Sequence, residues 1–154
     1  MNKSRKFVSA AAAIAIMGSA VSLTAASAAP ETGIQVTNRC GSGYGRIDSE
    51  NLNALGPNYG VVYLFYNGAN GYNCVFTEKL VARGVSTYTT AVLCRASDGG
   101  CVSDPPTGGN GYYRHYAGPI YLYARSTCVS WGGRVTNTNG TYDAFRSGWE
   151  HCGR

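Results

Sequence analysis

The two histidines of this chain are its best candidates for acid–base chemistry. His115 and His151 would act as acid and base in a small ribonuclease, with Arg114 binding the phosphate. The simpler interpretation is that His115 belongs to a tyrosine-rich strand and that His151 is a terminal residue beside a disulfide cysteine. No Gly-x-Ser-x-Gly segment occurs, so the sequence does not indicate a serine hydrolase of that type. We expect a protein that is not an enzyme, and the ribonuclease is kept as an alternative.

The chain has six cysteines, and an even number in an exported protein indicates three disulfides: Cys40, Cys74, Cys94, Cys101, Cys128 and Cys152. No two of them have the Cys-x2–4-Cys spacing of a zinc site, so we expect no metal and no cofactor. Cys94 and Cys101 enclose a short loop and are expected to pair. Cys74 and Cys128 occupy equivalent places in two similar segments, which favours the pairs Cys40–Cys74 and Cys128–Cys152. The arrangement Cys40–Cys152 with Cys74–Cys128 remains open.

The loop between Cys94 and Cys101 suggests a second alternative. It carries Arg95 and is followed by Pro105-Pro106. A rigid loop of this kind could present its arginine to a protease, because preorganisation lowers the entropy lost on binding. The chain could therefore be a secreted protease inhibitor. The simpler interpretation is that the disulfide only staples the end of a hairpin.

Aromatic side chains are the third feature, with 12 tyrosines and 2 tryptophans in the chain. In a strand at 119–124, Tyr121 and Tyr123 would point to one face and their aliphatic neighbours to the other. Exposed tyrosines could stack on the sugar rings of a cell-wall polysaccharide or on a protein partner, whereas buried ones would fill cross-strand pairs. The candidate ligand-binding residues are Tyr63, Tyr112, Tyr121, Tyr123 and Trp131.

The N-terminus has the pattern of a signal peptide. Basic residues precede an apolar stretch, and Ala26-Ser27-Ala28 is a small-x-small cleavage site. We expect residues 1–28 to be removed, which leaves 29–154 as a single secreted β domain. Without its three leader cations the chain has 10 basic and 8 acidic residues, a net charge of +2 rather than +5, so charge does not indicate nucleic-acid binding. No other apolar run approaches the roughly 18 residues of a membrane span, so no membrane association is expected after cleavage.

Two segments of similar sequence form the centre of the predicted fold. In 61–77, β-branched and aromatic residues flank two Asn-Gly pairs, which are a strong hairpin signal. A similar order of Tyr-Leu, an aromatic residue and then Cys-Val returns in 119–131 after a shorter turn. We interpret both segments as hairpins built on one plan. Asn139-Gly140 predicts a further turn between strands at 134–136 and 142–145.

The remaining pattern is also that of a β protein. About eight short strands with turn signals between them predict an all-β fold, a small disulfide-stabilised sandwich or barrel. Gly132-Gly133 predicts a bulge or a close backbone approach inside a strand. Only residues 49–55 could form one or two helical turns, since no other stretch after the leader has helical periodicity.

Five blocks of this sequence resemble a known family: Cys40-Gly-Ser-Gly-Tyr44, Val62-Tyr-Leu-Phe-Tyr-Asn67, Gly71-Tyr-Asn-Cys-Val75, Tyr116-Ala-Gly-Pro-Ile-Tyr121 and Cys128-Val-Ser-Trp-Gly-Gly133. They are similar to the spore-associated protein A family, small exported proteins of filamentous, spore-forming bacteria. Members usually have four cysteines, so the resemblance implies that Cys94 and Cys101 are an added pair. It also implies export and association with aerial hyphae or spore surfaces, and it implies no catalytic mechanism. The expected partner is a cell-wall polysaccharide or a spore-surface protein, and the oligomeric state stays open.

Overall fold

Antiparallel strands make up the fold of residues 36–154, which are the residues that the computed structural model describes. The nine strands are β1 (Gly45–Leu52), β2 (Gly60–Asn67), β3 (Tyr72–Lys79), β4 (Thr87–Arg95), β5 (Cys101–Asp104), β6 (Tyr112–Tyr113), β7 (Tyr116–Tyr123), β8 (Val129–Thr136) and β9 (Tyr142–Arg146). The predicted signal peptide, residues 1–28, lies outside the described residues. Within the described part there is no helix long and apolar enough to cross a membrane.

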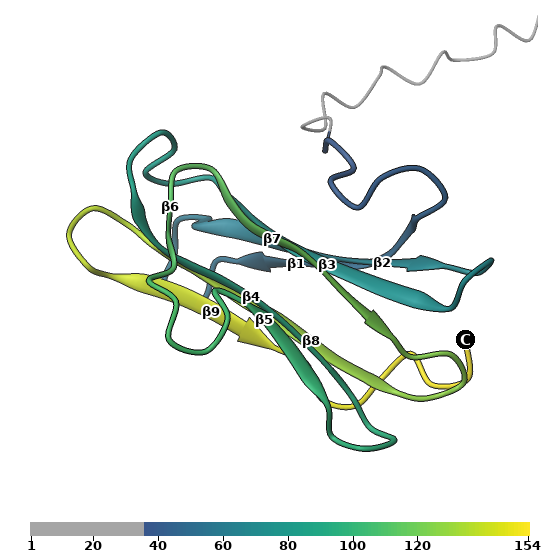
Figure 1. Cartoon of the computed structure of the whole chain (residues 1–154). Coiled ribbons are helices and arrows are strands. Elements are labelled where there is room, and N and C mark those ends of the chain that lie inside the picture. The colour runs from purple at the N-terminus through teal and green to yellow at the C-terminus, as the bar shows by residue number, and fades with distance from the viewer. Residues whose placement is uncertain (1–35) are drawn as a thin grey trace, which may run out of the picture. The chain divides into compact units, whose positions relative to one another are not determined.

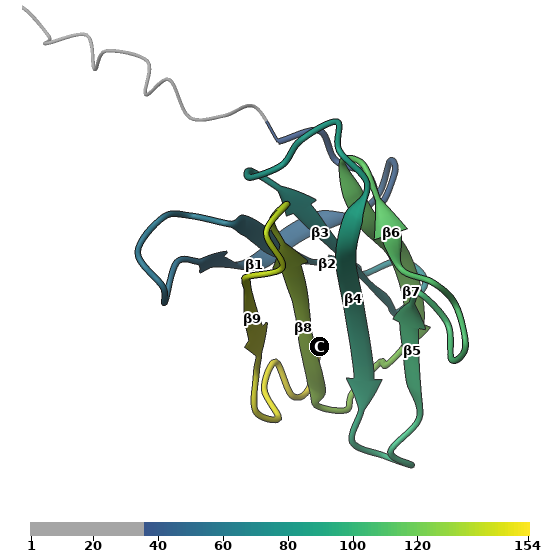
Figure 2. The same ribbon diagram turned by 90° about the vertical axis from the view of Figure 1, so that its left-hand side faces the viewer.

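The strands form two sheets packed face to face, as Figures 1 and 2 show. The first sheet has the order β1-β2-β3-β7. The second has the order β5-β4-β8-β9, and β6 pairs with β4 beside β5. The predicted all-β fold is confirmed, and of the two predicted architectures it is the sandwich.

The alternation of buried and partly exposed residues from Thr87 to Leu93 of β4 explains how the core is built between the sheets. In β4 the side chains of Thr87, Thr89, Ala91 and Leu93 are buried, and those between them are partly exposed. Alternate residues of a strand point to opposite faces, so one face of β4 supplies the core and the other faces outward. Trp131 of β8 joins the same core.

The first sheet is covered on both faces. Its inner face contributes to the core between the sheets, whereas Tyr63, Phe65 and Phe76 form a second apolar cluster on its outer face. The segment preceding β1 covers that cluster through Cys40, which is bonded to Cys74. This covering explains why β2 and β3 are buried along most of their length rather than at alternate positions.

The first predicted hairpin is confirmed by the pairing of β2 with β3, from Gly60 opposite Lys79 to Asn67 opposite Tyr72. Its turn contains Gly71 at a φ of 77°, a backbone conformation that glycine adopts without steric cost. The hairpin predicted around Asn139-Gly140 is also confirmed, because β8 pairs with β9.

The second of the two similar segments is not a hairpin. β7 pairs with β3 in the first sheet, whereas β8 pairs with β4 and β9 in the second. The connection between β7 and β8 therefore crosses from one sheet to the other. Two strands separated by a short turn can pair within a sheet or face each other across a core, and both arrangements require similar side chains. The similarity of the two segments thus predicted the strands correctly and their pairing wrongly.

The residues proposed for a helical turn are also placed differently. Ser49 to Leu52 belong to β1, whose register runs antiparallel to β2 with a shift between Arg46 and Asp48. Pairing with the edge of β2 overrides the weak local preference, as tertiary contacts often do for short segments.

Gly133 lies where β8 approaches β3 of the other sheet closely. A Cβ atom at this position would overlap Oγ1 of Thr77 on β3 and lie 2.7 Å from the carbonyl oxygen of Thr90 on β4. A Cβ on Gly132 would overlap the carbonyl oxygen of Phe145 on β9. The close backbone approach predicted for this glycine pair is confirmed.

Three disulfides connect the described residues, and they are the pairs that the sequence favoured: Cys40–Cys74, Cys94–Cys101 and Cys128–Cys152. Cys94–Cys101 joins two neighbouring strands, β4 and β5. The other two attach the segment before β1 to β3 and the C-terminal segment to the start of β8.

Candidate binding surface

A group of exposed tyrosines lies along the free edge of the first sheet. Tyr121 and Tyr123 of β7 have exposed fractions of 41% and 45%, and Tyr72 of β3 has 40%. The rings of Tyr72 and Tyr123 meet edge to face at a centroid distance of 5.6 Å. Those of Tyr44 and Tyr121 meet in the same way at 5.5 Å. We call these four residues the β7 tyrosine ridge.

Strand register explains why the rings gather there. Tyr72 lies opposite Tyr123 and Cys74 opposite Tyr121, so these side chains share the outer face of the first sheet. β7 is the last strand of this sheet, and no further strand covers that edge among the residues described. Tyr44 comes from the loop that the Cys40 disulfide holds against the sheet.

The ridge is held in place by contacts to the backbone and between rings. The Tyr121 hydroxyl donates a hydrogen bond to the Cys40 carbonyl oxygen at 3.2 Å. Partial burial, with a smaller contribution from Tyr44, raises the pKa of Tyr121 above the usual tyrosine value. The Tyr121 hydroxyl therefore keeps its proton at neutral pH. The ridge presents ring faces and edges for stacking and hydroxyl groups for hydrogen bonds, which is the chemistry required to hold a sugar ring.

The structure brings together only part of the predicted set. Tyr121 and Tyr123 lie together on the ridge. Tyr63 points to the same face, but it is buried against Phe76 beneath the segment ending in Cys40. Trp131 is enclosed in the core between the sheets, with an exposed fraction of 1%.

Tyr112 is exposed but lies elsewhere, on β6 beside the second sheet, where its ring contacts Tyr88. Two members of the ridge, Tyr44 and Tyr72, are absent from the predicted set. Tyr72 could have been found from the hairpin register, because it closes the turn opposite Asn67. Nothing in the sequence places Tyr44 beside Tyr121.

The two histidines do not share a site. His115 lines an open hollow of about 340 Å³ together with Tyr113, Asp104 and Tyr116. Burial and the hydrogen bond donated to Asp104 raise the pKa of Tyr113 to about 12, so this hydroxyl keeps its proton at neutral pH. His151 instead contacts an aspartate of β1 near the C-terminus.

That second histidine belongs to a small group of possible metal ligands. His151 Nε2 lies 2.8 Å from Asp48 Oδ2 and 3.9 Å from Glu150 Oε1, and donor atoms of the three residues lie within 4.8 Å of one another. Glu150 also accepts a hydrogen bond from the indole of Trp131. Side-chain contacts already use these groups to attach the C-terminal segment to β1 and β8.

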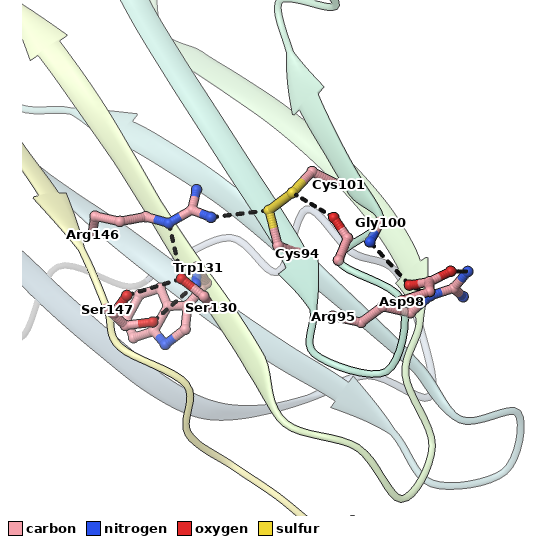
Figure 3. The surroundings of a disulfide bond; sticks show 10 residues. Cys94, Arg95, Asp98, Gly100, Cys101, Ser130, Trp131, Arg146 and Ser147 are labelled. Atoms are coloured by element: carbon pink, nitrogen blue, oxygen red, sulfur yellow. Dashed lines mark hydrogen bonds and ion pairs between the residues drawn. A yellow bond between two sulfur atoms is a disulfide. The ribbon is translucent and has the colours of Figure 1, made fainter.

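The loop closed by Cys94–Cys101 does not present a free arginine (Figure 3). Arg95 binds both carboxylate oxygens of Asp98, at 2.8 and 2.7 Å, and donates to the Tyr123 carbonyl oxygen at 3.0 Å. The hydrogen bonds from Arg95 hold the pKa of Asp98 well below its usual range. A protease could bind the Arg95 side chain only after these contacts had been broken.

The fold and the exposed tyrosines define a small, disulfide-stabilised β-sandwich whose candidate site is an open surface. The chain is 40% identical over 98 residues to Spore-associated protein A of Streptomyces coelicolor. This similarity covers 64% of the present chain and 57% of the relative, so the chain spans little more than half the length of that protein. It confirms the resemblance to the spore-associated protein A family. No model of a protein family matches the chain, and no solved structure matches it.

Proposed function

We propose that this protein is a secreted, non-enzymatic protein of the spore or aerial-hypha surface that binds cell-wall polysaccharide through the β7 tyrosine ridge. The relative is named a spore-associated protein, and three disulfides are typical of exported domains. These facts support a protein that works outside the cell. The observation that carries the binding proposal is the ridge itself, four tyrosines in two edge-to-face pairs on an open strand edge.

The magnitude of ridge binding follows from the area that it exposes. Burying a large apolar side chain completely contributes about 1.5–3 kcal/mol, so a half-exposed ring that becomes covered contributes roughly 1 kcal/mol. Loss of both Tyr121 and Tyr123 would then cost roughly 2 kcal/mol, or about a 30-fold loss of affinity. Such binding would resist salt, because ring stacking is not screened as ion pairs are.

A pelleting experiment tests the proposal. The oxidised protein is mixed with washed spores or purified cell walls of the producing organism at low and high salt, and the fraction that sediments is measured. We expect the protein to sediment at both salt concentrations, and the double variant Tyr121→Ala/Tyr123→Ala to stay in solution at high salt. Trp149→Ala is the matched control, since Trp149 is an aromatic residue that is even more exposed (54%) but lies outside the ridge. Equal sedimentation of the double variant and the control would reject the ridge as the binding surface.

The two alternatives receive less support. A ribonuclease using His115 and His151 would require the histidines to converge on one phosphate, yet each lies in a different group of contacts. An inhibitor using Arg95 would have to break the contacts with Asp98. RNA cleavage abolished by His115→Ala, or protease inhibition abolished by Arg95→Ala, would favour the corresponding alternative.

A further inference from the structure

A row of tyrosines and arginines crosses the outer face of the second sheet. The Tyr112 and Tyr88 rings meet edge to face at 6.1 Å. The Arg134 guanidinium lies between two rings, with its carbon 5.2 Å from the Tyr88 centroid and 3.5 Å from the Tyr142 centroid. The row thus runs from β6 over β4 and β8 to β9, and Figure 2 shows these strands side by side.

The sheet register places this row outside the core. Val135 pairs with Thr89 and both are buried, so their neighbours Arg134 and Tyr88 point outward. The residue paired with Arg134 on β9 is Ala144, which has a small side chain, and Arg134 Nε donates to Thr136 Oγ1 at 3.3 Å. Tyr112 and Tyr142, at the two ends of the row, are exposed.

A second arginine lies on the same face. Arg146 Nε donates to Ser130 Oγ at 2.9 Å, and Arg146 Nη2 lies 2.9 Å from Cys94 Sγ. Figure 3 shows its side chain extending across the strands toward the Cys94–Cys101 disulfide. Arg146 itself is exposed. We call Tyr88, Tyr112, Arg134, Tyr142 and Arg146 the arginine face.

The charge of the arginine face is not balanced by carboxylates on it. In the described part of the chain, neither Arg134 nor Arg146 takes part in an ion pair. Asp143 belongs to β9, but its side chain points inward and is buried, with one oxygen accepting from the Ala144 amide at 2.7 Å. Two positive charges therefore face outward beside exposed tyrosines.

We propose that the arginine face binds an acidic polysaccharide whose sugars carry carboxylates. A guanidinium binds a carboxylate through two parallel hydrogen bonds, and the ring edges beside it can pack on the sugar. Arg134 is already fixed between two tyrosines, so it loses little side-chain entropy on binding. Rings at the ends of the row and cations along it fit a chain in which sugar rings and negative charges recur.

This site is separate from the β7 tyrosine ridge, since it lies on the other sheet and depends on charge. Its binding weakens as salt rises, whereas ridge binding does not. The protein with Tyr121→Ala and Tyr123→Ala keeps its affinity for the acidic polysaccharide. If the protein failed to sediment at high salt, the proposed ridge would be rejected and the proposed arginine face would not. If the protein failed to bind the acidic polysaccharide, the arginine face would be rejected and the ridge would not.

Affinity for polygalacturonate tests the proposal, with neutral dextran and inorganic polyphosphate as comparison polymers. Binding of the oxidised full-length mature protein is measured by calorimetry at low and high salt. Loss of one charge-assisted, bidentate contact predicts about a tenfold weaker affinity for Arg134→Gln. Arg134→Lys keeps the charge but loses the planar contact, and is expected to weaken binding nearly as much. Arg46→Gln is the control, because Arg46 is exposed on β1 of the other sheet.

Three results would overturn the proposal. One is the absence of salt-sensitive binding to polygalacturonate. Another is an equal loss in Arg46→Gln and Arg134→Gln, which would show that only net charge matters. The third is tighter binding to polyphosphate that Arg134→Gln also weakens, which would identify the face as a site for phosphate polymers. Near-ultraviolet circular dichroism verifies that each variant is folded, and Tyr112→Ala provides a second test without touching a charge.

Discussion

Removal of the Cys40–Cys74 disulfide should be the most destabilising of the disulfide deletions. The bond attaches the segment before β1 to Cys74 near the start of β3, and both cysteines are buried. This segment covers Tyr63 and Phe76 on the outer face of the first sheet. Without the bond, only non-covalent contacts would hold the cover in place.

The size of the effect follows from the lengths of the closed loops. A separation of 34 residues gives about 4 kcal/mol from the chain-entropy relation, whereas the 7-residue separation of Cys94–Cys101 gives about 2.4 kcal/mol. Cys128–Cys152, with a separation of 24, lies between them at about 3.5 kcal/mol. For Cys40–Cys74 the loss of a buried sulfur adds to the value of about 4 kcal/mol from chain entropy, because Cys74 is completely enclosed.

Urea unfolding of the paired alanine variants measures these differences. We expect the free energy of unfolding to fall most in Cys40→Ala/Cys74→Ala and least in Cys94→Ala/Cys101→Ala. The first variant should also bind a hydrophobic dye, because Tyr63 is uncovered when the segment detaches. If the Cys94–Cys101 deletion proved equally costly, with the same denaturant dependence, neither loop length nor the covering segment would control stability as argued.

Three further predictions concern single residues. Gly133→Ala should lower the free energy of unfolding by about 1–3 kcal/mol in the same urea assay, because the new methyl group overlaps Thr77. Gly45→Ala is the control and should change this free energy little, because the space around its Cβ position is open. Tyr113 should ionise near pH 12 in a titration followed at 295 nm, and Tyr113→Phe should remove that step. Because the folded pKa of Tyr113 exceeds the unfolded value of 10, its contribution to stability is complete below pH 10 and is lost as the pH rises toward 12. Burial lowers the pKa of Lys79 from 10.5, so the unfolded chain binds more protons than the folded protein just below that pH, and stability rises with pH there. Lys79→Met should abolish this rise when urea unfolding is followed as the pH approaches 10.5.

Local signals predicted the strands of this protein better than their partners. The Asn-Gly turns predicted the β2–β3 and β8–β9 hairpins correctly, because a tight turn between two strands depends only on residues that are adjacent in the sequence. Whether β7 and β8 pair or face each other depends on which other strands compete for their edges, and that is not a local property. β7 pairs with β3, and β8 lies between β4 and β9. The helical interpretation of 49–55 was wrong for the same reason, since the free edge of β2 decides the conformation there.

The residues of the candidate site also divide into those that local alternation predicts and those that depend on the tertiary structure. Alternation along β7 placed Tyr121 and Tyr123 on one face, and both are exposed. The same alternation placed Tyr63 on the outer face of its sheet, but the segment that ends in Cys40 covers it and is attached to β3 by the Cys40–Cys74 disulfide. Trp131 alternates inward on β8 and lies in the core. A pattern of period two thus gives the side of a sheet to which a residue points, and only the tertiary structure shows whether that side is open.

A sandwich of two sheets has two outer faces, and in this protein they differ in chemistry. On the first sheet a disulfide-bound segment covers Tyr63, Phe65 and Phe76 on the outer face, and the tyrosine ridge lies at the edge of the sheet. On the second sheet the outer face carries Arg134 between the rings of Tyr88 and Tyr142, and Arg146 beside Ser130 and Cys94. The two faces point away from each other, so one polymer on each could be bound at the same time. Two weak contacts on one rigid domain raise the effective concentration of each polymer near the other. A monomer with both surfaces would therefore connect a neutral and an acidic polysaccharide, whereas a protein with either surface alone could only coat one of them.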